Sequence, residues 1–297
     1  MDIRYLKGKE IEKVKWNSCV HYAGNGNIFG YHWYLNHVAK DWDCLVEDDY
    51  ASVFPLVWRQ GWFGHRALYQ PRLMRAMGVY SIHVLSQARL RAFLEAIPPS
   101  FRQLDIVLNE QNRPPEDLDF DIQRLTNHQL LLNQPFEVLE ENFTPDLKDK
   151  IAQAEGRGLL ATTSLKPETI AAFYRQHAKD RNKEEKVHTL QRIMYNVLHR
   201  GWGYAAGIQD AGGDLLAVNF YMYSHGKVTS LVPVESAEGS RQGALSYLLH
   251  MLVRSHATRP LVLDFNTSAD DALARSFGAL PNPYFRLRRD RRVLGLF

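Results

Sequence analysis

Hydrophobic and polar positions alternate most regularly in the second half of the chain. Three extended segments are predicted, at Tyr204–Gln209, Leu215–Ser224 and Lys227–Val234, and the glycines between them supply the positive φ that tight hairpin loops require. The apolar residues of Gly239–His256 then recur at helical spacing, and Pro260–Phe265 is another extended segment. We therefore expect three strands, a helix and a further strand in this order.

The rest of the chain carries comparable patterns. Further helices are expected at Glu10–Val20, Phe29–Val38, the segment from Ser86 to Pro98, Phe136–Phe143, Pro145–Ala154, Glu168–Ala178 and Thr189–His199. Further strands are expected at Ile3–Tyr5, Asp43–Glu47, Ala51–Arg59, Gln103–Leu108, Phe120–Leu125, His128–Leu132 and Leu159–Ser164. The order of elements after Leu159 resembles the order between Ile3 and Leu108, so a repeated unit is the most economical explanation. We predict an α/β fold with mixed sheets.

Length and composition fit two domains rather than one. The chain has 297 residues, with 45% hydrophobic and 23% charged, as expected for a globular protein with sizeable cores. We place one domain at residues 1–145 and the other at 146–297, because the boundary falls near the predicted helix that begins at Pro145. Disordered and membrane-spanning classes do not fit this composition.

Charge and cysteine content restrict the function further. A formal charge of +3 is too small to argue for nucleic-acid binding by itself. The two cysteines do not make a disulfide framework, the start of the chain lacks an apolar signal region, and no segment is apolar enough to anchor in a membrane. We expect a cytoplasmic protein. The twelve histidines lack the spacing of a zinc site, so no metal is expected.

A glycine-containing segment, 238–244, precedes the predicted amphipathic helix. Glycines let the backbone amides at a helix start approach a phosphate closely, and Arg241 offers a fork of donors to phosphate oxygens. Arg241 equally suits an exposed ion pair with Glu238 or Glu235. The segment is therefore a candidate for holding a phosphate-bearing acyl donor.

Several short motifs occur in an order that resembles a known family. They are Pro55–Leu56, Tyr69–Pro71, Gly78–Ser81, Lys150–Ala154 before Gly158–Leu159, Glu238–Gly239 with Gly243–Ala244, Leu263–Phe265 with Ser268, Leu273–Arg275 and Phe277–Ala279. Together with the order of elements, they resemble the GCN5-related N-acetyltransferases (GNAT). A tandem pair of such domains is similar to the Fem-type peptidyltransferases and the FemAB-like acyltransferases of Bacteroidetes.

The resemblance implies two tandem GNAT-like domains and an N-acyltransferase. The pantetheine arm of an acyl-CoA co-substrate would lie where two strands splay apart, and a small-molecule or peptide amine would attack its thioester. No permanently bound cofactor is implied. Fem-type enzymes instead take an aminoacyl-tRNA as donor and a peptidoglycan precursor as acceptor, which is the alternative reaction. A scaffold that binds without catalysis is a third interpretation.

The chain departs from the family pattern at three places. In the usual acetyl-CoA loop, Gln or Arg stands where this chain has Ser240. The family's Phe-Glu-Gly-Ser is replaced by 265–268, which reads Phe-Asn-Thr-Ser. The helix that commonly carries a tyrosine before its Phe-Gly has Arg275 and Ser276 there. These departures favour a donor other than acetyl-CoA, or the scaffold interpretation.

Three residues are candidates for proton transfer. Asp264 ends an apolar strand, so it either faces the predicted gap or caps the helix expected to follow at Ala269. Glu235 follows the predicted strand Lys227–Val234, and it is either a base or an exposed loop carboxylate. Tyr284 follows Pro281 and Pro283, and it either donates a proton at the open end of the site or packs.

The remaining candidates bind the donor or the acceptor. The predicted donor-binding residues are Gly239, Ser240, Arg241, Gln242, Gly243, Asn266 and Ser268. Asn266 and Ser268 also have local explanations, as a turn residue and a helix cap. By analogy with the family, the acceptor occupies a cleft between the domains, lined by Gln70, Arg72 and Trp58, which opens the aromatic segment Trp58–Trp62.

Overall fold

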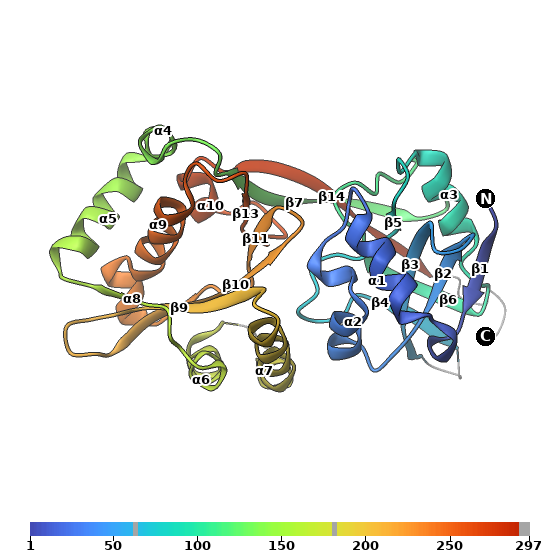
Figure 1. Cartoon of the computed structure of the whole chain (residues 1–297), viewed down its shortest axis with the longest axis horizontal. Coiled ribbons are helices and arrows are strands. Elements are labelled where there is room, and N and C mark those ends of the chain that lie inside the picture. Colours follow the sequence, from blue (N-terminus) through green and yellow to red (C-terminus); the bar gives the residue numbers. More distant parts are fainter. Residues whose placement is uncertain (62–64, 180–182, 291–297) are drawn as a thin grey trace, which may run out of the picture. The chain divides into compact units, whose positions relative to one another are not determined.

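The computed structural model describes residues 1–61, 65–179 and 183–290, so Trp62 lies outside the described residues. The chain forms two compact units (Figure 1). The first comprises Met1–Thr126 and the described chain from Pro283 onwards, and the second comprises Asn127–Asn282.

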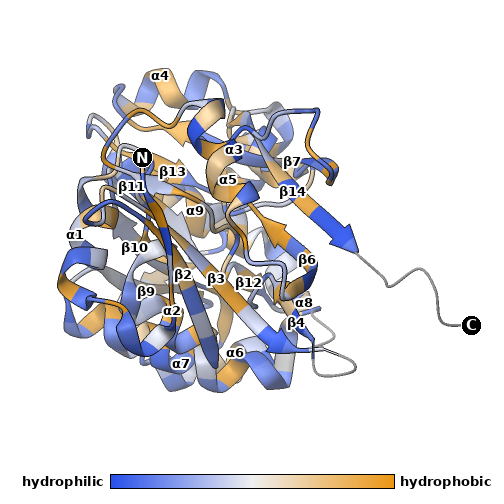
Figure 2. Cartoon of the chain, turned by 90° about the vertical axis from the view of Figure 1, so that its right-hand side faces the viewer, coloured by the Kyte–Doolittle hydropathy of each residue, from blue (hydrophilic) through white to orange (hydrophobic). Residues whose placement is uncertain are grey.

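The first unit is a mixed sheet with helices. Its strands are β1 (Ile3–Leu6), β2 (Asp41–Glu47), β3 (Ser52–Gln60), β4 (Arg66–Tyr69), β5 (Tyr80–Ser81), β6 (Phe101–Val107) and part of β14 (Leu280–Asp290). Its helices are α1 (Lys13–Tyr22), α2 (His32–Val38) and α3 (Gln87–Glu95), with 3-10 turns η1 (Gly8–Glu10) and η2 (Ile28–Gly30). The strands pair in the order β1-β2-β3-β4-β6-β14. Hydrophobic residues run along these strands (Figure 2).

The second unit repeats this plan. Its strands are part of β7 (Asp121–Leu131), then β8 (Leu160–Thr162), β9 (Gly203–Gln209), β10 (Leu215–Ser224), β11 (Lys227–Ser230), β12 (Val234–Glu235) and β13 (Val262–Asp264). Its helices are α4 (Phe136–Glu141), α5 (Pro145–Gly156), α6 (Pro167–His177), α7 (Lys183–His199), α8 (Ala237–Gln242), α9 (Ala244–His256) and α10 (Ala272–Ser276). The strands pair in the order β8-β9-β10-β11-β13-β7.

The two units correspond strand for strand. In each, four antiparallel-paired strands lead to one parallel pair, which is β4 with β6 in the first unit and β11 with β13 in the second. Each unit also has a two-residue strand that pairs antiparallel with its third strand: β5 pairs with β3, and β12 pairs with β10. The predicted repeat and the mixed α/β class are therefore confirmed.

Each sheet is completed by the strand that the order along the chain would assign to the other unit. β14, near the end of the chain, joins the first unit, and β7 joins the second. Residues 286–290 of β14 pair antiparallel with β6, whereas residues 129–131 of β7 pair antiparallel with β13. The compact units consequently divide at 126/127 and 282/283, and not at the predicted 145/146. β7 is also one continuous strand where two were predicted.

Helix α9 anchors the core of the second unit. Its predicted apolar stripe is buried, and it consists of Leu245, Leu248, Leu249, Leu252 and Val253. The stripe packs with residues of β9, β10, β13 and α5, which include Ile208, Tyr221, Leu263 and Ile151. Burial of such side chains is the main favourable term in folding.

Two histidines of α9 are buried beside this stripe. Burial lowers the pKa of both His250 and His256 from the usual value near 6.5. The charged groups that face them are Glu155, Glu140 and Arg254 around His250 and Arg259 near His256. The carboxylates oppose the effect of burial at His250, and the arginines add to it. Both rings are therefore neutral near pH 7.

We predict that stability falls as the pH drops below about 6.5. In that range the unfolded chain binds protons at these two histidines that the folded chain does not, so acid favours unfolding. Urea denaturation should give a smaller free energy of unfolding near pH 5.5 than near pH 7.5. His250→Phe keeps an aromatic ring and removes one titrating group, so its decrease should be shallower. An equal decrease in this variant would contradict the prediction.

Candidate functional site

The parallel strands β11 and β13 separate after three residue pairs. Lys227, Val228 and Thr229 pair with Val262, Leu263 and Asp264. Beyond this point the chain after β11 continues its ladder with β10, where Leu231 N–H donates to the Phe220 carbonyl at 2.9 Å. The chain after β13 continues its ladder with β7, where Phe265 N–H donates to the His128 carbonyl at 3.0 Å. The parallel pairing therefore ends where the diverging strands were predicted, while each strand keeps its outer neighbour.

Asn219 holds the chain on the β10 side of this divergence. Its Nδ2 donates to Ser230 Oγ at 2.7 Å, and its Oδ1 accepts the Val232 N–H at 3.1 Å. These bonds fix the irregular residues between β11 and β12, so that Val234 and Glu235 pair with β10 again. Asn219 could not be identified from the sequence, because a polar residue within an apolar strand has no local signature.

The corresponding pair in the first unit closes again. β4 and β6 pair up to Tyr69 and Asp105, and the chain then returns so that Met77 bridges to Leu108. Gln70 fills the interval, since its Nε2 donates to the Met74 carbonyl at 2.7 Å and its Oε1 accepts the Val107 N–H at 2.9 Å. Of the two units, the second is thus the one whose parallel strands stay apart.

Asp264, at the end of β13, is buried in a network of hydrogen bonds, with 1% of its surface exposed. Its Oδ1 accepts from Asn127 Nδ2 at 2.9 Å and from the Asn266 N–H at 2.8 Å. Its Oδ2 accepts from Gln129 Nε2 at 3.3 Å. Both oxygens therefore hold the turn after β13 against β7. Asp264 does not cap a helix as expected, because α10 begins at Ala272 and is capped by Asp271. Its predicted role in proton transfer stays a prediction.

A histidine and a threonine lie next to this network. His128 Nδ1 is 3.0 Å from Thr267 Oγ1, and the Thr267 N–H donates to Asn127 Oδ1 at 2.9 Å. His128 is buried, and its Nε2 lies 3.7 Å from the Asp270 carboxylate. Asn127 and His128 carried no sequence signal for this site, because β7 precedes the predicted domain boundary. Their contacts span more than 130 residues of sequence.

The predicted phosphate-binding segment is a short helix, α8. Ser236 caps it by accepting the Gly239 N–H at 2.9 Å, and the Ser240 N–H donates to the Ser236 carbonyl at 2.9 Å. The Gly243 N–H also bonds within the helix, and Gly243 adopts a left-handed conformation (φ 71°) that separates α8 from α9. Three amides of the predicted cradle are thus engaged inside the chain.

Acidic groups surround the start of α9. Glu235 Oε2 accepts the Leu245 N–H at 3.3 Å, so a carboxylate already caps the first turn. Glu238 hydrogen-bonds both Arg241 and Gln242, and these two bonds hold its pKa below the usual value. Arg241 therefore forms the exposed ion pair that was its alternative interpretation. Glu235 is half-buried and lies at the diverging strands.

The two predicted residues after β13 have different environments. Asn266 lies in the turn with a positive φ of 59°, held by its N–H bond to Asp264. Ser268 is exposed and does not cap a helix, since Asp271 caps α10 by accepting the Ala274 N–H at 2.8 Å. Their predicted contacts with a donor stay predictions.

The other candidates belong to the first unit. Tyr284 is buried with Ala76 and Val107, and the Arg75 guanidinium carbon lies 5.3 Å from its ring centroid. Trp58 lies on β3, and the guanidinium carbon of Arg66 is 4.2 Å from the centroid of its ring. Arg72 is exposed, and Gln70 is engaged by Met74 and Val107 as described above. Their predicted roles toward an acceptor or at the end of the site stay predictions.

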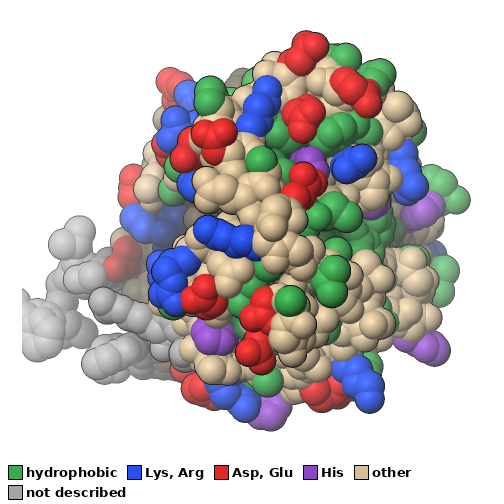
Figure 3. Space-filling model, turned by 90° about the vertical axis from the view of Figure 1, so that its left-hand side faces the viewer, with side chains coloured by type: hydrophobic (Ala, Val, Ile, Leu, Met, Phe, Trp, Pro, Cys, Tyr) green, Lys and Arg blue, Asp and Glu red, His purple; other side chains and the backbone are tan. Residues whose placement is uncertain are grey.

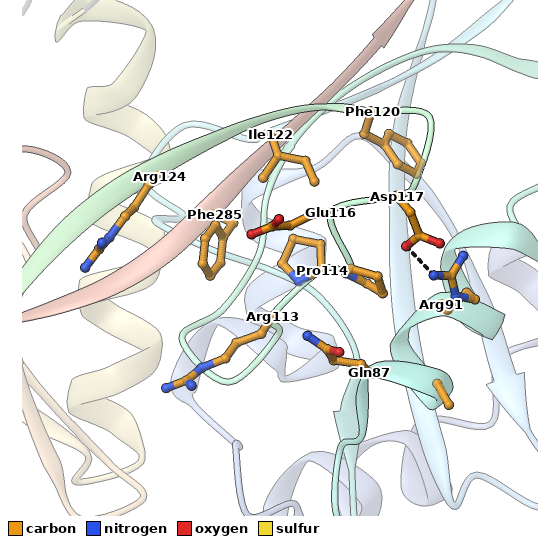
Figure 4. A pocket seen from close by; sticks show the side chains of 12 residues that line it. Gln87, Arg91, Arg113, Pro114, Glu116, Asp117, Phe120, Ile122, Arg124 and Phe285 are labelled. Atoms are coloured by element: carbon orange, nitrogen blue, oxygen red, sulfur yellow. Dashed lines mark hydrogen bonds and ion pairs between the residues drawn. The ribbon is translucent and has the colours of Figure 1, made fainter.

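The first unit also has a pocket of about 980 Å³ (Figure 4). Arg113 and Arg124 line it, together with Arg91, which is paired with Asp117. Phe120, Phe285, Ile122, Pro114 and Pro115 supply apolar surface. The lining suits an anionic group attached to an apolar one. Trp58, Gln70 and Arg72 are not among the lining residues.

Two further properties concern the described part of the chain as a whole. Its histidines, cysteines and carboxylates form no cluster of three or more that is suited to a metal ion. None of its helices combines the length and the apolar character that a bilayer span requires.

Comparison with solved structures identifies the fold. Neither a protein-family model nor a curated protein matches this chain. The structure of FemX matches with a TM-score of 0.65 at 11% identity, covering 96% of this chain and 97% of FemX. L-PGS from Bacillus licheniformis matches with a TM-score of 0.55 at 13% identity, covering 95% and 93%.

A tandem GNAT protein from the clavulanic acid biosynthesis pathway also matches, with a TM-score of 0.57 at 13% identity. The match covers 97% of this chain and 98% of that protein. At these identities the likeness concerns the fold. The chain has the fold of tandem GNAT and FemAB-like proteins, and the predicted fold class is confirmed.

Proposed function

We propose that the second unit transfers an acyl group from a CoA thioester to an amine. The observation that carries this proposal is that the parallel pairing of β11 with β13 ends at Thr229 and Asp264, after which the two chains follow β10 and β7. The donor arm is proposed to lie between them. The first unit closes the equivalent position with Gln70 and the bridge of Met77 to Leu108. The fold shared with a tandem GNAT protein supports the same chemistry.

The reaction needs a group that accepts the proton of the attacking amine. The amine nitrogen bonds to the acyl carbon, the carbon–sulfur bond breaks, and the thiolate leaves and takes up a proton. Of the two carboxylates near the diverging strands, Glu235 is half-buried, whereas both oxygens of Asp264 are engaged by β7 and its own turn. We assign the base to Glu235.

The acceptor is an amine on a small molecule or peptide. Trp58, Gln70 and Arg72 stay the residues predicted to contact it, and Tyr284 the predicted proton donor to the thiolate. Gly239, Ser240, Arg241, Gln242, Gly243, Asn266 and Ser268 stay the residues predicted to hold the donor.

An aminoacyl-tRNA is the second candidate donor, and one observation favours it. Glu235 occupies the start of α9, where the pyrophosphate of CoA would otherwise gain from the helix dipole. A donor whose phosphates bind elsewhere would avoid this repulsion. The likeness in fold to FemX is consistent with such a donor.

Calorimetric titration distinguishes the donors. We would titrate the protein with acetyl-CoA, longer acyl-CoAs, S-acetylpantetheine and a charged tRNA. Binding of an acyl-CoA, with S-acetylpantetheine binding more weakly, supports the proposal and its phosphate contacts. Equal binding of the two indicates that only the pantetheine arm is held. Binding of charged tRNA alone supports the second candidate, and binding of none of them leaves a scaffold without transfer activity.

We predict that Glu235→Gln separates binding from turnover. Removing the charge from the start of α9 should strengthen acyl-CoA binding by about three-fold. Loss of the base should lower kcat by about 100-fold. Titration and steady-state kinetics with an acyl-CoA and an amine measure the two effects. Glu238→Gln removes a nearby charge that is not assigned to proton transfer, so kcat should stay unchanged. A similar fall in both variants would refute the role of Glu235.

A further inference from the structure

A second pocket, of about 490 Å³, lies on the second unit between α4, α5 and α9. Residues Asn219, Glu235 and Asp264 at the diverging strands do not line it. On this face of the molecule, acidic, basic and hydrophobic side chains lie close together (Figure 3). The function of this pocket is therefore a separate question from the proposed transfer.

His250 forms the buried part of the pocket. Only 3% of its surface is exposed, and within the described chain neither ring nitrogen has a hydrogen-bond partner. The ring is fixed by Phe136, which packs edge-on at 5.3 Å, and by Tyr247, which stacks at 6.1 Å. A buried nitrogen without a hydrogen-bond partner is unfavourable, so a polar ligand that bonds to it is favoured.

The nearest charged group is a carboxylate. Glu155 Oε1 lies 3.9 Å from His250 Nε2, which is too far for a direct hydrogen bond. A donor atom to one side of the line that joins these two atoms, about 2.8 Å from each, can bond to both. Because the His250 ring is neutral near pH 7, one of its nitrogens accepts a hydrogen bond.

The rest of the lining favours a positive ligand. Glu137, Glu140 and Glu155 contribute three carboxylates, against two cations from Lys148 and Arg254. The Arg254 guanidinium already lies over the Phe136 ring at 5.8 Å. Ile151 and Ala152 supply apolar surface at the same pocket.

We propose that this pocket binds a primary ammonium group carried on a short alkyl chain. The ammonium donates one hydrogen bond to the unprotonated Nε2 of His250 and another to Glu155, and the alkyl chain lies against Ile151 and Ala152. An anion would meet three carboxylates, and an apolar ligand would leave both ring nitrogens unpaired. The described residues offer no three-ligand set for a metal. The inference does not depend on the transfer reaction.

Titration with n-butylammonium chloride, followed by the nitrogen resonances of the histidine rings, tests the proposal. The His250 resonances are identified by their absence in His250→Phe. In the wild-type protein one of them should shift and saturate in the millimolar range. n-Butyrate at the same ionic strength should leave it unchanged. No shift with butylammonium, or an equal shift with butyrate, would overturn the proposal.

Variants locate the site. Glu155→Gln should weaken binding of butylammonium roughly ten-fold, as expected for the loss of one charge-assisted hydrogen bond. His250→Phe, followed through the Glu155 carboxylate resonance, should weaken it similarly. Lys148→Gln is the matched control, because it removes a like charge and should strengthen binding by about two-fold. Unchanged affinity in Glu155→Gln would overturn the proposal even if the histidine variant failed to fold, because Glu155 lies on the exposed side of α5.

Discussion

Replacing Asp264 by alanine is expected to lower the free energy of unfolding by about 3 kcal/mol. The carboxylate accepts three hydrogen bonds in a buried position, from Asn127, Gln129 and the backbone of Asn266. Alanine leaves these donors without their acceptor and releases the turn after β13 from β7. Urea denaturation of the wild type and the variant, followed by tryptophan fluorescence and circular dichroism, measures the difference.

Asp264→Asn is the variant that separates structure from catalysis. Asparagine keeps one acceptor oxygen, and the amides of Gln129 and Asn282, which hydrogen-bond at 3.0 Å, can rotate to accommodate its NH2 group. We expect a loss of about 1 kcal/mol and turnover within about three-fold of the wild type. A well-folded Asp264→Asn protein whose kcat falls 100-fold would show that Asp264 is the base and would transfer the role from Glu235.

The order of elements could be predicted from the sequence because it depends on local periodicity. The apolar stripe of α9 and the alternation of β9, β10 and β11 are properties of consecutive residues. The repeat followed from that order. The order and the repeat need no knowledge of which distant segments pair, whereas the divergence of β11 from β13 was expected only from the resemblance to the GNAT family.

The partners of the site could not be predicted, because they come from distant pairings. Asp264 is held by Asn127, which is 137 residues away, and the strand that carries Asn127 belongs to the first half of the chain. The exchange of β7 and β14 between the units depends on the competition of two similar strands for two similar edges. No local pattern distinguishes them.

Gly239 shows how one residue type supports two explanations. From the sequence, its missing side chain suggested close approach of a donor phosphate. In the structure Gly239 is buried on α8 against β10, and an ideal Cβ atom would lie 2.1 Å from the Leu216 carbonyl oxygen. Because that atom belongs to the backbone, no side-chain rotation relieves the clash. The packing of α8 on β10 alone therefore requires glycine.

Gly239→Ala is accordingly expected to destabilise the second unit by about 3 kcal/mol or more. Displacement of α8 should also shift Glu235 and the start of α9, so acyl-CoA binding should be lost together with stability. Gly156→Ala is the matched control, since Gly156 is also helical, its Cβ would meet open space, and stability should stay equal or rise by about 0.5 kcal/mol. Urea denaturation and acyl-CoA titration of both variants test this. A Gly239→Ala protein with wild-type stability and no acyl-CoA binding would instead show that the glycine serves the donor phosphate.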